Sequence, residues 1–187
     1  MQSLCHGEWS VGGGHPYAAR VVEASPARSL HVEAATPEDF PRIAELTAGV
    51  YREEGLAPEE YQRELRDVAG RARRAELLVA RDGDSLVGSV ALVLAGEFGE
   101  ITDSEDEAAF RMLVVDPTAR GRSIGELLVQ ACLERARAAG KRRMVLSTDP
   151  KMTAAHRLYE RLGFTRLPER DWSPLPGVQL MAYARDL

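Results

Sequence analysis

A basic turn that contains glycine carries the clearest chemical signal in this chain. It spans Arg120–Gly125 (RGRSIG), after the apolar run Met112–Val115 and before an amphipathic segment that ends near Gly140. A strand that leads through such a turn into a helix leaves the first helical N–H groups without internal partners, and the helix dipole adds positive charge there. Glycines let a ligand approach the main chain, and arginines add charge and forked donors. The pattern predicts a binding site for a phosphate or pyrophosphate group.

Three phosphate-binding patterns compete for this turn. The nucleotide P-loop requires Gly-x-x-x-x-Gly-Lys-Ser/Thr, and the chain has no Lys-Ser or Lys-Thr pair. The dinucleotide fingerprint Gly-x-Gly-x-x-Gly is not supplied by Gly121 and Gly125. The remaining pattern is similar to motif A of the GNAT superfamily, the acyl-CoA-dependent N-acetyltransferases, whose usual form is Arg/Gln-x-x-Gly-x-Gly/Ala. Here Ser123 takes the place of the first glycine, and a turn without any ligand stays the alternative.

Composition places the chain among ordinary globular proteins and excludes several functions. It has 187 residues, 44% hydrophobic and 28% charged, with a net charge of −5 that argues against nucleic acid as a partner. No apolar run is long enough for a membrane span, and no secretory signal begins the chain, so we expect a cytoplasmic protein. Two cysteines give no disulfide framework, and the spacing of Cys5, His6 and His15 fits no common metal site.

The elements that must position the turn can be predicted from periodicity and turn residues. Residues 1–29 lack a usable pattern and are interpreted as a mobile N-terminal extension, so the domain proper covers residues 30–187. Strands alternating with helices predict an α/β or α+β fold, a three-layer α/β/α sandwich around a mixed, largely antiparallel sheet. We expect strands at 30–35, 77–80, 86–94, 108–115, 144–147, 164–167 and 178–183, and helices at 37–51, 58–73, 124–139 and 150–162.

A second segment strengthens the resemblance. Asp149–Phe164 (DPKMTAAHRLYERLGF) is similar to motif B of the same superfamily, commonly Asn-x-x-Ala-x-x-Leu-Tyr-x-x-x-Gly-Phe. Two separate motifs in the right order are more specific than either alone, and the resemblance covers about residues 30–187. It implies a splayed sheet that admits acyl-CoA where the strand ending at Val115 diverges from the next. The residues at the matching positions are Met152, Ala155, Leu158, Tyr159, Gly163 and Phe164.

The resemblance implies acetyl-CoA as cosubstrate and requires no metal. The pyrophosphate would contact the amides of the basic turn, and the pantetheine arm would lie along the apolar strand as an added pseudo-strand. An amide of this strand would also donate to the thioester oxygen. The cofactor-binding residues expected on this basis are Leu113, Val114, Val115, Arg120, Gly121, Arg122, Ser123, Ile124, Gly125, Met152 and Ala155.

Two residues are candidates for proton transfer. Tyr159 matches the general acid of the family, because a phenol with a pKa near 10 is protonated at neutral pH. A half-buried core tyrosine is the alternative. Many relatives carry a glutamate where this chain has Ala109, and Glu107 lies two residues earlier on the same strand face. Glu107 is therefore the candidate base, and a solvated acidic loop is the alternative.

The expected reaction is acetyl transfer to a primary amine by direct attack in a ternary complex. An acidic stretch at residues 97–107 favours a cationic acceptor, and family members set acceptor choice through the first two helices and the loops near Trp172. The resemblance also allows a homodimer. Ser123, Met152 and Ala109 depart from the family pattern, which leaves a weakly active or inactive acyl-CoA-binding module as the second hypothesis. A protein that binds ATP or NAD through the turn is the third.

Overall fold

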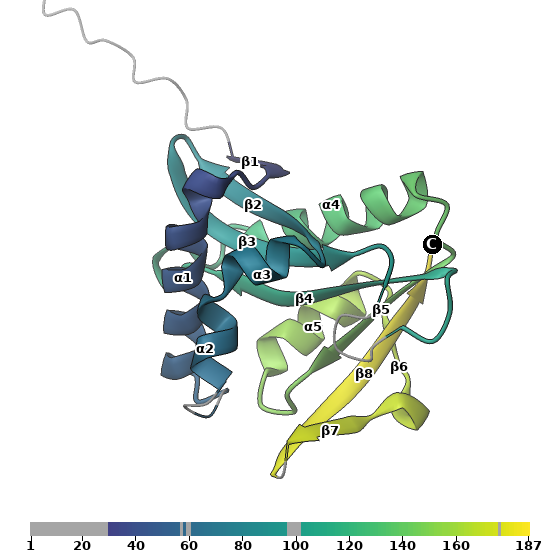
Figure 1. Ribbon diagram of the computed structural model, residues 1–187. Coiled ribbons are helices and arrows are strands. Elements are labelled where there is room, and N and C mark those ends of the chain that lie inside the picture. Colours follow the sequence, from purple (N-terminus) through teal and green to yellow (C-terminus); the bar gives the residue numbers. More distant parts are fainter. Residues whose placement is uncertain (1–29, 57, 59–60, 97–101, 176) are drawn as a thin grey trace, which may run out of the picture.

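The computed structural model describes residues 30–56, 58, 61–96, 102–175 and 177–187, so the expected extension at residues 1–29 lies outside the described part. Helices and strands alternate as the sequence predicts (Figure 1). In chain order they are β1 (Leu30–Ala34), α1 (Phe40–Glu53), α2 (Tyr61–Arg66), α3 (Val68–Ala72), β2 (Glu76–Asp82), β3 (Ser85–Val93), β4 (Glu107–Val115), α4 (Ile124–Ala138), β5 (Arg143–Thr148), α5 (Thr153–Arg161), β6 (Thr165–Arg166), β7 (Trp172–Leu175) and β8 (Val178–Asp186).

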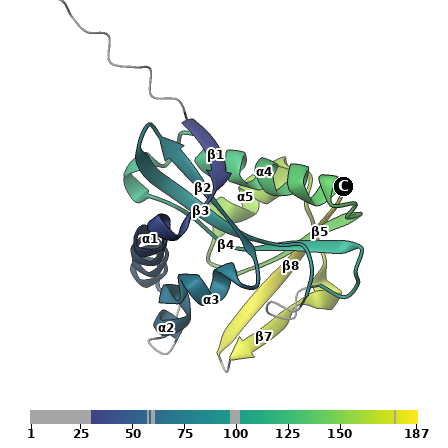
Figure 2. The same ribbon diagram turned by 45° about the horizontal axis from the view of Figure 1, so that its top comes forward.

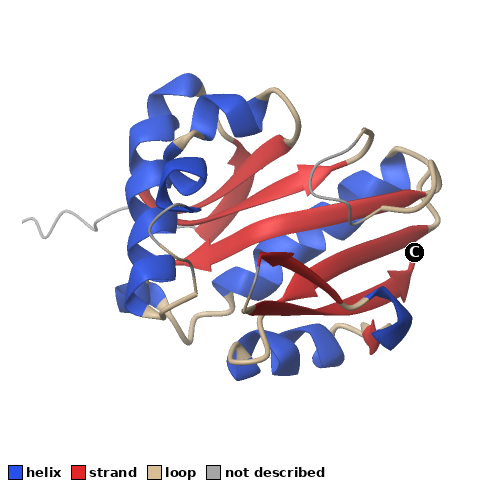
Figure 3. Cartoon of the chain, turned by 60° about the horizontal axis from the view of Figure 1, so that its bottom comes forward, coloured by secondary structure: helices blue, strands red, loops and turns tan. Residues whose placement is uncertain are grey.

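The strands form one sheet whose two halves part in the middle. Its order is β1-β2-β3-β4-β5-β8-β6, with β7 added to β8, and β4–β5 is the parallel pair in an otherwise antiparallel sheet. Strand β4 pairs with β5 over Glu107–Ala109 alone, although it stays paired to β3 as far as Val115. The sheet is therefore splayed beyond Ala109, as expected (Figure 3).

Helices cover both faces of this sheet, and alternation along the strands explains why (Figures 2 and 3). In β2, Leu78 and Ala80 pack in the core beneath α4 and α5, whereas Leu77 and Val79 pack in the core beneath α1 and α3. Successive strand residues point to opposite faces, so a strand buried on both sides reads as a continuous apolar run. The three-layer sandwich is confirmed.

Three elements differ from the expected ranges. The helix predicted at 58–73 is two short helices, because Asp67 between them accepts a hydrogen bond from the Gly70 amide (2.8 Å) and caps α3. Helix α5 begins at Thr153 and not at residue 150, since Asp149 Oδ1 accepts from the Lys151 amide (2.8 Å) in a turn. Strand β7 lies where a loop was expected, with Trp172 paired to Leu180.

Within the described ranges, no helix combines the length and the apolar character needed to cross a membrane. In the same ranges, no group of three or more His, Cys, Asp or Glu side chains is arranged to hold a metal ion. Cys132, on the inner face of α4, is a free thiol buried in the core, where it packs as a small apolar residue.

Candidate active site

A bulge in β4 gives the site its shape. Ser89 pairs with Val114 and Ala91 with Arg111, so Met112 and Leu113 together face one residue of β3. Met112 has a φ of 52°, which is unusual for a residue other than glycine. The extra residue breaks the alternation of side chains, and neighbouring Arg111 and Met112 line the same cavity.

The basic turn before α4 leaves several backbone N–H groups open at the N-terminus of that helix. Gly121 (φ 78°) and Ser123 (φ 58°) both adopt the left-handed conformation. Among the described residues, no acceptor takes a hydrogen bond from the backbone N–H groups of residues 121–126. These donors lie at the positive end of a helix of 15 residues. Open backbone donors therefore lie at the turn where the sequence predicts a phosphate site.

Charged side chains fix the turn in place. Asp116 accepts hydrogen bonds from the Thr118 amide (3.0 Å) and from Arg42 of α1 (2.7 Å). Hydrogen bonds from Thr118, followed by the positive charge of Arg42, hold the pKa of Asp116 below its usual range. Arg120 forms an ion pair with Glu54 (2.5 Å) at the end of α1, and Arg122 pairs with Asp82 (2.8 Å) at the end of β2.

A groove of about 430 Å³ runs from the unpaired part of β4 to the N-terminus of α4, with α5 as its other wall. All expected cofactor-binding residues except Arg122 line it. Arg122 points instead to the Asp82 carboxylate. The lining residues that the sequence predicts are Leu113, Val114, Val115, Arg120, Gly121, Ser123, Ile124, Gly125, Met152 and Ala155.

Two glycines allow the walls of the groove to approach. A Cβ atom at Gly125 would lie 3.3 Å from Cδ2 of Leu158 on α5, and one at Gly88 would lie 3.0 Å from the Val114 carbonyl oxygen. Gly88 thus lets α4 pack closely against β3 and the end of β4 near Val115. An elongated ligand with an anionic end fits this groove.

A second hollow of about 270 Å³, here called the acceptor cavity, adjoins the groove. Met152 lines both hollows. The cavity is lined from α1, α2, β4, β5 and the β7–β8 hairpin by Tyr51, Leu56, Pro58, Tyr61, Arg111, Met112, Ser147, Thr148, Asp149, Met152, Trp172, Pro174, Val178 and Leu180.

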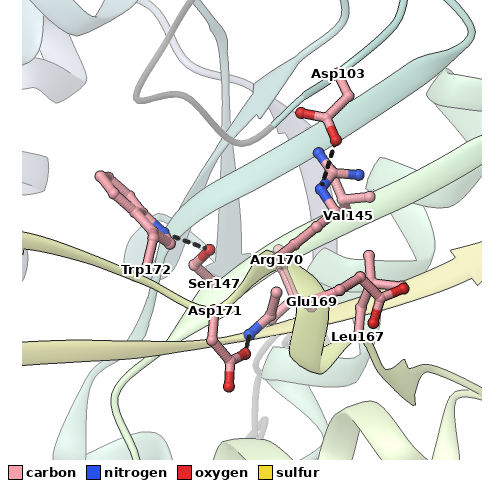
Figure 4. Close-up of a pocket in the computed structure, with 10 residues that line it drawn as sticks. Asp103, Val145, Ser147, Leu167, Glu169, Arg170, Asp171 and Trp172 are labelled. Carbon is pink, nitrogen blue, oxygen red and sulfur yellow. Dashed lines mark hydrogen bonds and ion pairs between the residues drawn. The ribbon is translucent and has the colours of Figure 1, made fainter.

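Trp172 separates the acceptor cavity from a third hollow of about 310 Å³ (Figure 4). Its indole Nε1 donates to the Ser147 hydroxyl (3.1 Å), and both residues line both hollows. The third hollow is polar, with Asp103 paired to Arg170 (3.0 Å) and Asp171 on its wall. The hydrogen bond between Trp172 and Ser147 fixes one wall of the acceptor cavity.

Tyr159 is buried on the inner side of α5. Its side chain is 4% exposed and its ring packs against Phe110, Phe164 and Tyr183 at centroid distances of 5.8–6.1 Å. Burial raises the pKa of its phenol above the ordinary value. Its neighbours Ala155 and Leu158 line the groove, but Tyr159 lines neither the groove nor the acceptor cavity.

Glu107 is held by structural partners. It is 7% exposed, and its carboxylate oxygens accept hydrogen bonds from Arg170 (2.9 and 3.1 Å) and from the Asp103 amide (2.9 Å). It begins β4 at the paired end of the sheet and lines neither the groove nor the acceptor cavity. Other described carboxylates of the acidic stretch also pair with cations, as Asp106 does with Arg142 (3.5 Å) and Asp103 with Arg170.

The acceptor cavity contains residues that were not singled out from the sequence. Tyr51 and Tyr61 come from the first two helices, which were expected to set acceptor choice together with the region of Trp172. Burial raises the pKa of both tyrosines. Arg111 and Asp149 are the charged residues of the lining. One sequence signal was present, since Arg111 is a charged residue inside the apolar run 108–115.

The fold and the site combine a groove beside the unpaired part of β4 with a smaller cavity that shares Met152 with it. Residues 40–164 match the acetyltransferase (GNAT) family. The chain belongs to this family, which confirms the resemblance inferred from the two sequence motifs.

Individual relatives agree with this assignment. Mycothiol acetyltransferase of Mycobacteroides abscessus is 38% identical over 94 residues, which are 49% of this chain but 29% of that protein. The chain thus spans less than a third of that relative. An acetyltransferase of the GNAT family from Staphylococcus aureus has a TM-score of 0.68 at 16% identity, covering 85% of this chain and 99% of its own. A Salmonella typhimurium protein solved with its cofactor acetyl-CoA has a TM-score of 0.64 at 18% identity, covering 85% and 94%.

Proposed function

We propose that this protein transfers an acetyl group from acetyl-CoA to a primary amine by direct attack in a ternary complex. The observation that carries the proposal is Met152, which lines both the groove and the acceptor cavity. Two ligands can therefore be held with their reactive ends together, which removes much of the entropic barrier to a bimolecular reaction. Family membership supports acetyl-CoA as the donor.

The residues of the groove have separate tasks in this proposal. The free N–H groups of residues 121–126 bind the pyrophosphate, with Arg120 adding charge. The edge of β4 at Leu113–Val115, unpaired on the β5 side, offers backbone groups to the pantetheine arm. Acetyl-CoA supplies the activated thioester. An N–H of β4 beside the bulge would donate to its carbonyl oxygen as negative charge develops there.

Proton transfers complete the reaction. The amine nitrogen forms a bond to the carbonyl carbon, the C–S bond breaks, and the thiolate takes up a proton. Tyr159 is the proposed acid, and its raised pKa keeps it protonated at neutral pH. The ammonium proton must leave to a base. Asp149 lines the acceptor cavity and we assign it this role ahead of Glu107, whose carboxylate is occupied by Arg170.

Thermal unfolding with acetyl-CoA, CoA, ATP and NAD, each in excess, tests the cofactor. A ligand at about 100 times its Kd stabilises the protein by roughly 2.7 kcal/mol, equivalent to a shift in Tm of about 5–10 °C. We expect this shift with acetyl-CoA and CoA alone. Release of CoA thiol in the presence of amines then tests transfer. A similar shift with ATP or NAD would favour a nucleotide-binding protein instead.

An acyl-CoA-binding module with little or no activity is the second proposal. The buried position of Tyr159 and the absence of a carboxylate at Ala109 favour it. This module would be stabilised by CoA yet release no thiol with any amine, and Tyr159→Phe would change nothing measurable. A cytoplasmic location, a homodimer and a cationic acceptor remain predictions.

A further inference from the structure

Strand β4 is strained where it passes between the groove and the acceptor cavity. Met112 has a φ of 52° in the bulge, a conformation that costs free energy for residues other than glycine. Met112 lines the acceptor cavity, and the next residue, Leu113, lines the groove. The peptide unit that joins these two residues therefore lies between the two hollows. Strain of this kind persists only where neighbouring groups hold it in place.

Arg71 of α3 contacts the bulge from the side of the helices. It is 2% exposed, its Nη1 donates to the sulfur of Met112, and its Nη2 donates to the carbonyl oxygen of Leu65 in α2 (3.3 Å). A guanidinium is planar and rigid, so the bond to the backbone of α2 also fixes the direction of the donor to Met112. Helix α3 is itself capped by Asp67. Arg71 thus links the two short helices to the strained residue of β4.

Packing leaves Met112 little freedom to move away from Arg71. Met112 is 7% exposed and packs with Ala48 and Leu65 in one apolar cluster. The gap enclosed by Arg71, Thr47 and Met112 is too small to hold a water molecule. A shift of the Met112 side chain would therefore have to displace protein atoms.

Stability alone does not explain an arginine at this place. Burial lowers the pKa of Arg71, because desolvation disfavours its charged form, although a guanidinium stays protonated at neutral pH. A thioether sulfur is a weak acceptor and offsets little of this cost. A well-packed apolar side chain of similar volume is often at least as stable as a buried charged group. The contact between Arg71 and Met112 is better explained by its effect on β4.

We propose that Arg71 is a positioning residue for acetyl transfer. Through the side chain of Met112, it holds the peptide unit between Met112 and Leu113 in the orientation in which the backbone of β4 donates to the thioester oxygen. Arg71 lines neither the groove nor the acceptor cavity, so it acts through Met112. A preorganised donor to a developing oxyanion contributes about 10²–10³-fold to kcat, and a donor that is held loosely contributes less. This inference rests on the proposed acetyl transfer.

Arg71→Met tests the positioning role, with Arg73→Met as the matched control. Both changes replace a guanidinium by an unbranched apolar side chain, but Arg73 is exposed. With the most active amine of a panel, we expect Arg71→Met to lower kcat by about tenfold or more, while the KM of the amine and the Kd of CoA change by less than about threefold. The urea midpoint should not fall. Arg71→Lys keeps a charged donor and should restore part of kcat, and Arg73→Met should keep all of it.

A double-mutant cycle and hydrogen exchange supply readouts that a purely structural role would not change. Met112→Leu removes the sulfur at nearly constant volume. We expect this change to lower kcat by a factor similar to that of Arg71→Met, and the variant with both changes to have a kcat no lower than either single variant. In the protein without ligands, the Leu113 amide should exchange at least about threefold faster in Arg71→Met, while the amides of β2 keep their rates.

The outcomes separate the positioning role from the reaction that it serves. If folded Arg71→Met keeps the kcat of the wild type, the inference is wrong and acetyl transfer stands. If kcat and the urea midpoint fall together and Met112→Leu keeps full kcat, Arg71 is structural and the inference is overturned. Should Arg71→Met not fold, full kcat in Met112→Leu overturns the inference by itself. If the wild type binds CoA but acetylates no amine, the proposed function fails, and the inference fails with it.

Discussion

The guanidinium of Arg170 lies 2.9 and 3.1 Å from the two carboxylate oxygens of Glu107, joining the start of β4 to a segment 63 residues later in the chain. The side chains are 17% and 7% exposed, so the pair is largely shielded from water. Breaking a shielded pair of this kind from one side costs stability, since the remaining charge loses one of its partners. Glu107 thus fixes the segment before β7, which carries Trp172 to the acceptor cavity.

Glu107→Gln should therefore reduce stability more than catalysis. We expect a loss of roughly 1–3 kcal/mol in the free energy of unfolding, because one charge of the pair is removed and Arg170 stays. Urea unfolding measures the change. The control is Glu105→Gln, since the Glu105 side chain is exposed. A hundredfold fall in kcat at unchanged stability would instead make Glu107 the catalytic base.

Tyr159→Phe should lower kcat by roughly a hundredfold while leaving the Kd of CoA unchanged, because a general acid acts on the transition state and not on the bound ground state. Removing a buried hydroxyl should not reduce stability. Burial raises the pKa of this phenol. Ionisation of Tyr159 should therefore not lower the kcat of the wild type between about pH 7 and 10. Tyr183→Phe is the matched control on the same ring cluster. Full activity of Tyr159→Phe would restrict Tyr159 to packing.

Ser123→Gly should stabilise the protein. Ser123 adopts a φ of 58°, which costs an L-residue roughly 1 kcal/mol relative to glycine. The expected gain raises Tm by about 2–4 °C for a chain of this size. Ser123→Val, with a β-branched side chain at the same φ, should lower Tm. An unchanged or lower Tm for the glycine variant would show that the serine hydroxyl compensates the strain.

Asp116 should contribute a pH-dependent part of the stability. Hydrogen bonds from Thr118 and the charge of Arg42 lower its pKa in the folded state, so the ionised form favours folding. This contribution is present above its unfolded pKa of about 4 and is lost as the pH falls through the lower folded value. The difference in stability between wild type and Asp116→Asn should shrink between about pH 5 and 3. Asp84→Asn, in an exposed turn, should show no such trend.

Local residue chemistry was sufficient to predict most of the fold. Helices α4 and α5 are followed by Gly140 and Gly163, whose φ values are 75° and 79°, and Gly83 in the β2–β3 hairpin turn has a φ of 60°. The sequence predicts a helix end or a turn at each of these glycines. The residues of the groove also follow from two sequence motifs, because a turn and the helix after it are adjacent in the chain. Local signals of this kind need no tertiary information.

Features that depend on distant contacts were missed. A loop was expected between the last two predicted strands, yet β7 forms there with Pro174 in it, because β7 lies at an edge where a missing N–H is tolerated. The bulge at Met112 cannot be inferred from a run of apolar residues, since no glycine marks it. Helical spacing predicts that Tyr159 faces the core. It does not predict the ring contacts with Phe110 and Phe164, because these residues belong to other parts of the chain.

Strand β4 loses its parallel neighbour beyond Ala109, so its amides that point into the opening have no partner strand. In hydrogen-exchange measurements these amides should exchange early in the free protein, although they lie in the middle of the sheet. A ligand that bonds to this edge acts as a missing strand and should slow their exchange together with that of the neighbouring β3 amides. A ligand bound in the opening would therefore link the two halves of the sheet. We expect the domain to be most stable when the groove is occupied.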